Sequence, residues 1–227
     1  MQSLSTGINV LNPHQKAMFF GDLEKMFDKL HGKEISYNNM LDIDAALNLI
    51  EEFKGDPAFA ILKHNNACGL AVRPTPTEAW NVALSCDPVS AFGGVLICNR
   101  QVDAATAEEV NKLFFEVIIA PGYDDAALEI LESKKNRIIL VLRYASRGGQ
   151  QYRSLVNGVE VQDRETKLGG QDTEMKVVTE KGITDQQKKD LLFANIIVKH
   201  SKSNAIVFAK DNMLLASGIG QTSRVDA

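Results

Sequence analysis

Cysteine is scarce in this sequence of 227 residues, and nothing in its placement suggests cross-linking or metal binding. The three cysteines, Cys68, Cys86 and Cys98, are odd in number and include no Cys-x-x-Cys pair. A disulfide framework needs an even set, and a zinc knuckle needs closely spaced pairs. We therefore expect the three thiols to pack as small apolar side chains, as free cysteines commonly do.

Long apolar runs and a basic excess are also missing. No run reaches the ~18 residues that a membrane-spanning helix needs, and residues 1–12 lack the regions of a signal peptide. The net charge is −4 with both signs mixed along the chain, whereas a nucleic-acid groove carries a basic bias. These absences argue against membrane and nucleic-acid partners, and they favour a cytoplasmic globular protein.

Helix and strand patterns alternate over the first 145 residues. A buried strand is expected at the continuous apolar run of residues 58–62, and further strands are expected at residues 94–98, 117–120 and 137–142. Helices are expected over residues 42–53, from the capping box Thr75-Pro76-Thr77-Glu78, over 103–115 and over 124–133. This alternation predicts βαβ units, with a mainly parallel sheet covered by helices on both faces.

A change of pattern near residue 145 predicts a boundary between two units, residues 1–145 and 146–227. The elements expected after it are a hairpin turning at Asn157-Gly158, a helix from the capping box at Thr184 to about Lys199, and a hairpin turning at Asp211-Asn212. The sequence then ends soon after a glycine turn, so we expect the second unit to be unfinished.

The first candidate site is Lys63-His64, directly after a buried strand, with a turn expected over residues 65–69. Ligands of open α/β sheets bind beyond the carboxyl ends of strands. Histidine transfers protons near neutral pH, and lysine supplies a cation or a tuned base. Because neighbours along a strand point to opposite faces, the two can serve one ligand only if the strand is interrupted there. The alternative is a solvated lysine beside a histidine bonded to a loop carbonyl.

Two further segments carry polar groups that suit an anion. Residues 199–204 combine cations, hydroxyls and an amide in one connection, which can hold a phosphate or a carboxylate. An exposed helix end whose Lys199 and His200 favour the macrodipole explains them equally well. Gly218-Ile219-Gly220-Gln221 can bring backbone N–H groups near an anion, although a tight hairpin exit needs the same glycines.

Taken in order, nine segments resemble the AICAR transformylase domain, the C-terminal half of the bifunctional enzyme that also carries IMP cyclohydrolase. The segments are Asn12-Pro13-His14-Gln15, Ser36-Tyr37-Asn38-Asn39, Lys63-His64-Asn65-Asn66-Ala67-Cys68-Gly69, Asp87-Pro88-Val89-Ser90-Ala91-Phe92-Gly93-Gly94, Glu116-Val117-Ile118-Ile119-Ala120-Pro121, Lys134-Lys135-Asn136-Arg137, Val161-Gln162-Asp163, Lys202-Ser203-Asn204-Ala205 and Gly220-Gln221-Thr222-Ser223-Arg224-Val225-Asp226. Together they cover nearly the whole chain.

This resemblance implies an α/β fold of cytidine-deaminase-like three-layer αβα units in tandem, the second incomplete. It implies the transfer of a formyl group from the cosubstrate 10-formyltetrahydrofolate to the 5-amino group of AICAR, in de novo purine biosynthesis. No zinc is expected, and the full-length protein is expected to be a homodimer. The alternatives are a non-catalytic module that binds a nucleotide or folate, and a zinc deaminase, which would need the missing Cys-x-x-Cys.

The resemblance also implies roles for individual residues. His64 would accept the proton of the amine, Lys63 would supply positive charge or a proton near the folate, and Asn204 would position the formyl group. The expected substrate-binding residues are Asn39, Phe92, Glu116, Lys199, Gln221 and Arg224.

The sequence departs from the family pattern in two places. Ile8-Asn9-Val10 stand where the family usually has Arg-Tyr-Gly, and that arginine is expected to bind the nucleotide phosphate. The family also continues well beyond a segment like Ser223-Arg224-Val225, and its cyclohydrolase half precedes the transformylase. We therefore expect this chain to be a fragment that is inactive alone.

Overall fold

A computed structural model describes residues 25–143, 149–168 and 175–227. Expectations about Ile8-Asn9-Val10 and Asn12-Pro13-His14-Gln15 lie outside these ranges. The strands are β1 (Phe27–His31), β2 (Ala58–Lys63), β3 (Asn66–Val72), β4 (Gly94–Cys98), β5 (Phe115–Ala120), β6 (Ile138–Leu142), β7 (Gln150–Leu155), β8 (Gly158–Asp163), β9 (Ile206–Lys210) and β10 (Met213–Gly218). The helices are α1 (Tyr37–Ile50), α2 (Pro76–Cys86), α3 (Ala104–Val110), α4 (Asp125–Glu132) and α5 (Asp185–Lys199).

Eight of these strands form one mixed sheet in the order β1-β6-β5-β4-β2-β3-β10-β9, and β7 and β8 form a separate pair. Only the pairs β4–β5 and β5–β6 of the large sheet are parallel. The expectation of a mainly parallel sheet was therefore wrong. Two-residue turns join β2 to β3 and β9 to β10, and a connection that short can join only antiparallel neighbours.

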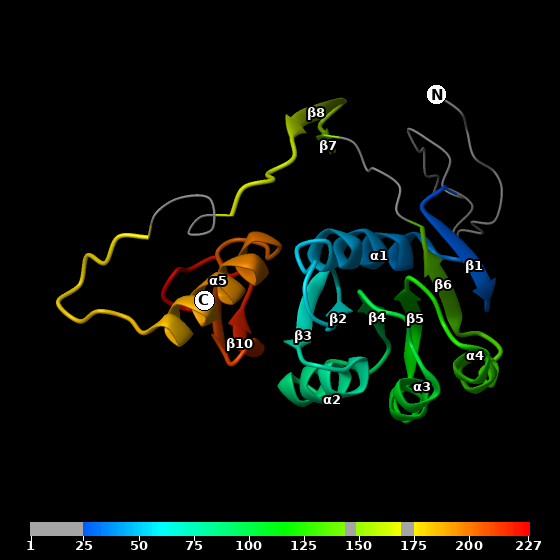
Figure 1. Cartoon of the computed structure of the whole chain (residues 1–227). Coiled ribbons are helices and arrows are strands. Elements are labelled where there is room, and N and C mark those ends of the chain that lie inside the picture. The colour runs from blue at the N-terminus through cyan, green and yellow to red at the C-terminus, as the bar shows by residue number, and fades with distance from the viewer. Residues whose placement is uncertain (1–24, 144–148, 169–174) are drawn as a thin grey trace.

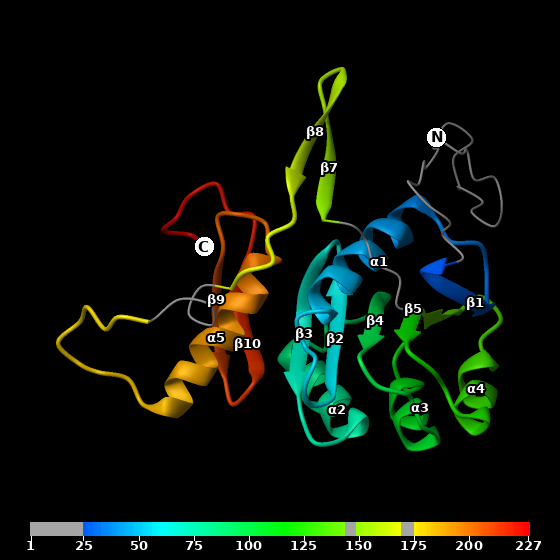
Figure 2. The same cartoon turned by 45° about the horizontal axis from the view of Figure 1, so that its top comes forward.

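Helices cover both faces of the sheet, as expected (Figure 1, Figure 2). One core lies between the sheet and α1 and α5, and the second lies between the sheet and α2, α3 and α4. Along β2 the side chains alternate between them, since Ala60 and Leu62 belong to the first core while Phe59 and Ile61 belong to the second. Burial on both faces explains why this strand is apolar throughout.

Two helix boundaries differ from expectation. The helix expected from residue 42 begins at Tyr37, because Ser36 and Asn39 form a capping box. The helix expected over residues 103–115 ends at Val110. Phe115 instead begins β5 and is buried. The helical pattern of the sequence continues past Val110, but the burial of Phe115 in the sheet favours a strand there more strongly than local helix propensity favours a helix.

The helix and both hairpins expected in the second half are confirmed, although the first hairpin turns one residue earlier than Asn157-Gly158, and Gly158 begins β8. Helix α5 follows the Thr184 capping box and ends at Lys199. Val156 and Asn157 join β7 to β8, and Asp211 and Asn212, both with positive φ, join β9 to β10. β10 pairs with β3, so the β9–β10 hairpin extends the large sheet. The tandem arrangement and the boundary near residue 145 stay predictions.

Within the described ranges, no helix combines the length and apolar character that crossing a membrane would require.

Candidate functional site

His64 and Asn65 form the turn between β2 and β3, with φ of 51° and 67°. The expectation of a turn over residues 65–69 was wrong, because β3 begins at Asn66 and pairs back onto β2. The strand is nevertheless interrupted at His64, which is the condition for Lys63 and His64 to serve one ligand. His64 is exposed and Lys63 is half-buried.

The Lys63 ammonium is held by the loop that precedes β4. Its Nζ donates to the carbonyl oxygens of Phe92 at 2.8 Å and Gly93 at 3.0 Å. An ammonium has three N–H groups, so one remains for a ligand. Gly93 has φ of +68°, and a Cβ built there would lie 3.1 Å from Lys63 Nζ. A larger residue at this position would therefore be strained and would crowd the cation.

Two exposed aromatic rings lie beside this cation. The rings of Phe92 and Phe114 have centroids 5.1 Å apart and are 60% and 52% exposed. The Gly93 N–H donates to the Phe114 carbonyl at 2.8 Å, which fixes the loop against the start of β5. Flat apolar surface next to a cation suits a polar heteroaromatic ring. Phe114 was missed in the sequence, since an apolar residue beside a buried strand is expected in the core.

Asp42 is a second residue that the sequence did not point to. Its Oδ1 accepts the Asn65 backbone N–H at 2.6 Å, so a carboxylate from α1 contacts the β2–β3 turn. Burial raises the pKa of Asp42, although the Asn65 hydrogen bond and the positive charges of His64 and Lys63 oppose that rise. The contact joins residues 23 positions apart. No local pattern could have revealed it.

Asn204 and Gln221 lie together, before β9 and after β10. The Asn204 N–H donates to the Gln221 carbonyl and the Gln221 N–H to the Asn204 carbonyl, each at 3.2 Å. Asn204 Nδ2 also donates to the Gln221 carbonyl at 3.1 Å. The Gly220 N–H donates to the Lys202 carbonyl at 2.7 Å. The backbone N–H groups of Gly220 and Gln221 are thus already bonded, against the anion-binding interpretation of this glycine turn.

Sheet topology brings the Lys63-His64 pair and the Asn204-Gln221 pair to the same edge of the sheet, where strands begin and end. β3 runs antiparallel to β2 and to β10, so the end of β2, the start of β3 and the end of β10 share that edge. His64 lies at the end of β2. Asn204, which precedes β9, and Gln221, which follows β10, lie at the end of β10. Arg73 fixes the hairpin from the opposite end, since its Nη1 donates to the Asp211 carbonyl at 2.8 Å.

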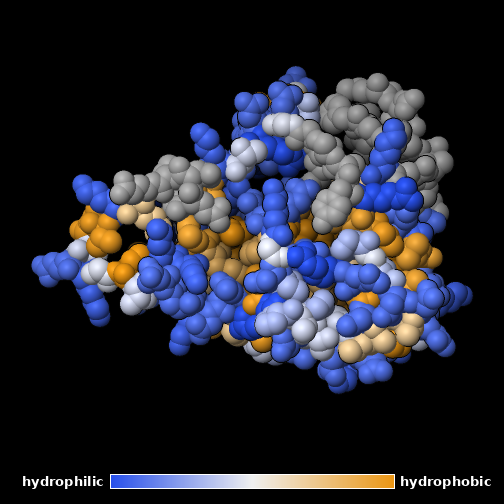
Figure 3. All heavy atoms as spheres, in the orientation of Figure 1, coloured by the Kyte–Doolittle hydropathy of each residue, from blue (hydrophilic) through white to orange (hydrophobic). Residues whose placement is uncertain are grey.

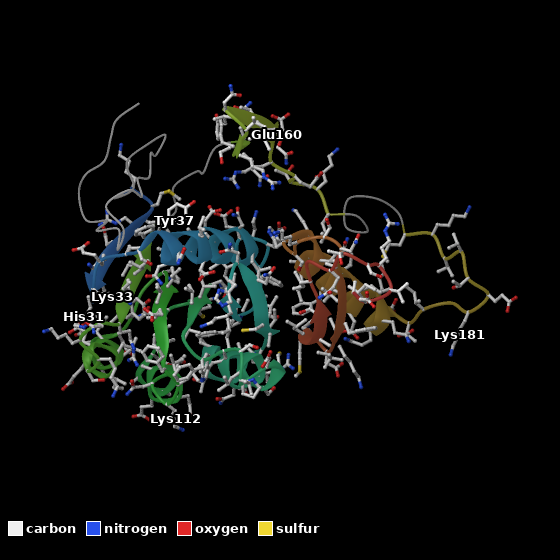
Figure 4. The ribbon with its side chains drawn as sticks, turned by 180° about the vertical axis from the view of Figure 1, so that it is seen from behind. His31, Lys33, Tyr37, Lys112, Glu160 and Lys181 are labelled. Atoms are coloured by element: carbon white, nitrogen blue, oxygen red, sulfur yellow. The ribbon has the colours of Figure 1, made fainter. Side chains whose placement is uncertain are left out.

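This edge is not the one that the general rule for parallel sheets indicates. Because β2 is antiparallel to β4, the carboxyl end of β2 lies at the amino ends of β4 and β5. Glu116 is the second residue of β5 and so lies near the same edge. It forms an ion pair with Lys33 at 2.5 Å, and Figure 4 shows Lys33 near His31 at the β1 end of the sheet.

The remaining predicted ligand contacts have other partners or positions. Asn39 is buried and its Oδ1 accepts from Ser36 Oγ at 2.8 Å, which caps α1. Lys199 Nζ contacts Glu52 Oε1 at 2.7 Å, between α5 and α1. Arg224 is exposed in the last segment. The structure thus gathers Lys63, His64 and Phe92, while Asn39 and Lys199 have structural contacts.

The cysteine thiols are protonated at neutral pH. Burial raises the pKa of Cys68 to about 12 and that of Cys98 to about 11. Among the residues that the structure describes, no group of three histidine, cysteine or acidic side chains is placed to hold a metal ion.

Comparison with known proteins gives one family and a consistent set of relatives. The model of the AICARFT/IMPCHase bienzyme family matches residues 3–227. The chain is 63% identical over 216 residues to the bifunctional purine biosynthesis protein PurH of Bacteroides thetaiotaomicron, covering 95% of this chain and 42% of that protein. Identity is 44% to PurH of Chlorobium luteolum and 46% to that of Persephonella marina, each with 95% of this chain and 43% of the relative covered. The chain therefore spans less than half the length of these relatives.

Proposed function

The chain belongs to the AICARFT/IMPCHase bienzyme family, and from that premise we propose that it carries part of an AICAR formyltransferase site. The proposed reaction moves a formyl group from 10-formyltetrahydrofolate to the 5-amino group of AICAR, in purine biosynthesis. The observation that carries this proposal is the exposed imidazole of His64 next to the anchored ammonium of Lys63, at the edge shared with Asn204.

The proposed role of His64 is to accept a proton. The AICAR amine is a weak nucleophile because its lone pair is delocalised into the ring and the carboxamide. Its attack on the formyl carbon therefore needs a base that removes the proton as the C–N bond forms. An exposed imidazole at the tip of a two-residue turn is accessible to such an amine, and imidazole changes charge near neutral pH.

Lys63 is proposed to act on the folate side of the same reaction. The attack places negative charge on the formyl oxygen, and the departing folate nitrogen must gain a proton. Two carbonyl oxygens hold the Lys63 ammonium in place, so its remaining N–H has a defined direction. A fixed cation needs little reorganisation when charge develops, and that is what makes such groups effective.

The aromatic pair and Asn204 complete the proposed site. Phe92 and Phe114 offer a flat exposed surface beside Lys63 for a planar ring of either substrate. The Asn204 side chain is tied to Gln221, and its amide oxygen can accept a hydrogen bond that orients the formyl group or the amine. No metal takes part in this proposal. We propose a cytoplasmic homodimer for the full-length protein, following the family resemblance.

The test compares the full-length protein with this chain alone. Each is incubated with AICAR and 10-formyltetrahydrofolate, and the release of tetrahydrofolate is followed. We expect turnover by the full-length protein and none by this chain, which spans 42% of a relative, because positioned catalysis tolerates little loss of supporting structure. Misplacing reacting groups by ~1 Å can alone cost about 100-fold.

Either of two results would contradict the proposal. A full-length protein that binds AICAR or folate without turnover would support the non-catalytic binding module. Turnover by this chain within about tenfold of the full-length rate would overturn the expected inactivity, because a loss of that size is below the cost of loose geometry.

A further inference from the structure

The turn that carries His64 adopts a backbone conformation that is uncommon for residues other than glycine. Both central residues have positive φ, 51° at His64 and 67° at Asn65. Two-residue hairpin turns of this kind prefer Asn-Gly or Gly-Gly, and a non-glycine residue in the left-handed region is uncommon, although histidine and asparagine enter it more readily than most. A contact from outside the turn would help to hold a histidine at the first position.

Asp42 supplies such a support from a different element. It lies in the second turn of α1, and its carboxylate reaches across to the Asn65 backbone N–H at 2.6 Å. This short, charge-assisted bond belongs to the stronger class of hydrogen bonds. A second side-chain hydrogen bond at the turn is internal, from Asn66 Nδ2 to the His64 carbonyl at 2.9 Å. Asp42 thus fixes the turn relative to the first core, on which α1 is packed.

The position of Asp42 also has an electrostatic consequence. Burial raises the pKa of Asp42, and Lys63 together with the protonated form of His64 opposes that rise. The carboxylate is therefore near the two groups that the proposed reaction uses. Asp42 is half-buried, whereas His64 is exposed.

We propose that Asp42 is a positioning residue for His64, acting through its hydrogen bond to the Asn65 backbone N–H. The proposal rests on the proposed formyltransferase function for its kinetic consequence, but the hydrogen bond can be tested without activity. Asp42 holds the imidazole at the distance and angle that proton transfer from the amine requires. Removing it should slow the chemical step more than it weakens substrate binding.

The kinetic experiment uses the full-length protein with Asp42→Ala, Asp42→Asn and Asp44→Ala. Asp42→Ala removes the acceptor, and we expect kcat to fall ~10- to 100-fold with KM for AICAR changed less than about threefold. Asp42→Asn keeps an acceptor oxygen and should retain kcat within ~5-fold of the wild type. Asp44→Ala is the matched control, because Asp44 lies on the same helix and accepts from Asn48 rather than from the turn.

The second readout follows the Asn65 amide in the full-length protein by NMR, with ¹⁵N-labelled asparagine. We expect hydrogen exchange at Asn65 to accelerate at least ~10-fold in Asp42→Ala, because a hydrogen bond from a charged acceptor is lost. Exchange should stay near the wild-type rate in Asp42→Asn and Asp44→Ala.

The two readouts separate the possible failures. An inactive wild-type full-length protein would overturn the proposed function. The exchange result would then still test the hydrogen bond between Asp42 and the Asn65 N–H. An active wild type in which Asp42→Ala keeps its kcat would overturn the positioning role. Equal loss of kcat in Asp42→Asn and Asp42→Ala, with Asn65 protected only in the former, would also overturn it, because the hydrogen bond would then not be the operative link.

Discussion

His64 breaks the alternation that would otherwise send it and Lys63 to opposite faces of β2. Its positive φ turns the chain at the end of the strand, while the Lys63 side chain is tied down by the Phe92 and Gly93 carbonyls. The His64 imidazole is thus accessible, and the Lys63 ammonium is fixed. An accessible imidazole suits a proton acceptor that contacts the substrate, and a fixed ammonium suits a cation that stabilises developing charge.

Replacing His64 tests its role directly. In the full-length protein, His64→Ala should lower kcat by about 10²- to 10⁴-fold, the usual contribution of general acid–base catalysis, with a smaller effect on AICAR binding. His31→Ala is the control, because His31 lies on β1 and bonds the Lys134 carbonyl at 3.3 Å. A drop of less than ~5-fold in His64→Ala would mean that His64 is structural.

Arg137 shows a cation used for packing. It is 4% exposed, and its Nη1 donates to Asn111 Oδ1 at 2.9 Å and to the Leu131 carbonyl at 3.0 Å. Its Cζ lies 4.1 Å from the centroid of the Phe115 ring. Burial lowers the pKa of Arg137 to about 10, so it stays charged at neutral pH. It joins the ends of α3 and α4 to the start of β5.

Arg137→Met should therefore destabilise the chain. Each hydrogen bond made by a charged group contributes ~1.5–3 kcal/mol, so we expect a loss of at least about 1.5 kcal/mol in the free energy of unfolding, measured with urea. The control is Lys112→Met, since the Lys112 side chain is 68% exposed and pairs with Glu109, three residues earlier in the chain (Figure 4). That exposed pair should contribute less than ~1 kcal/mol. Equal stability of Arg137→Met and wild type would refute this role.

Helices α1 and α5 meet at a small ion cluster just beyond their carboxyl ends. Glu52 Oε1 accepts from Lys199 Nζ at 2.7 Å and lies 3.0 Å from His200 Nε2. Burial alone would raise the pKa of Glu52, but the hydrogen bonds from Lys199 and His200 outweigh it and lower that pKa. This cluster links the second half of the chain to the first through side chains 147 and 148 positions apart.

The lowered pKa of Glu52 predicts how stability depends on pH. A carboxylate whose pKa is lower in the folded state stabilises the fold above its ordinary value of 4.5 and loses that effect as the pH falls through the folded value. Glu52→Gln should thus be less stable than wild type at pH 7, and the difference in urea midpoint should shrink as the pH falls below 4.5.

The matched control for this prediction is Glu108→Gln, which removes an exposed carboxylate from α3. It should leave the urea midpoint nearly unchanged at both pH values, because an isolated surface charge contributes little. A difference between Glu52→Gln and wild type that persists unchanged in acid would show that the Glu52 carboxylate is not the source of the stability.

Over the whole molecule, exposed apolar side chains gather in the second half of the chain. Figure 3 shows hydrophobic surface at the left of the molecule, where segment 175–183 and α5 lie in Figure 1. Within these two segments, Val178 is 85% and Leu191 is 48% exposed. β9 is the outer strand of the large sheet, and Phe208 on it is 64% exposed. An open strand edge with an apolar residue favours pairing with another chain.

We therefore expect this chain alone to self-associate at micromolar concentrations, as measured by sedimentation velocity. Phe208→Lys should shift the distribution toward monomer, because a lysine on an edge strand opposes pairing. Leu41→Lys is the control, since Leu41 is 40% exposed on helix α1, where no strand edge is open. A monomeric wild-type chain with a cooperative melt would contradict this prediction.

Much of the local structure was predictable from sequence because its causes are local. The capping boxes at Thr75 and Thr184 satisfy N–H groups within one helical turn, and both helices begin where they predict. Apolar runs such as residues 58–62 marked the buried strands, and Asp211-Asn212 marked a tight turn. The ordered motifs identified the family, which the comparison confirms. They also singled out Lys63 and His64 as neighbours at a strand end.

Sheet direction and the partners of the site residues were decided only by the tertiary structure. Whether a strand is parallel or antiparallel depends on the strand with which it pairs. The two-residue turn at His64 pairs β2 with β3, and strands joined by so short a turn must be antiparallel. The contact of Asp42 with Asn65 and that of Lys199 with Glu52 join segments far apart in the chain. Such contacts arise only when the helices pack on the sheet, because hydrogen bonds and ion pairs depend on distance in space and leave no periodic pattern in the sequence.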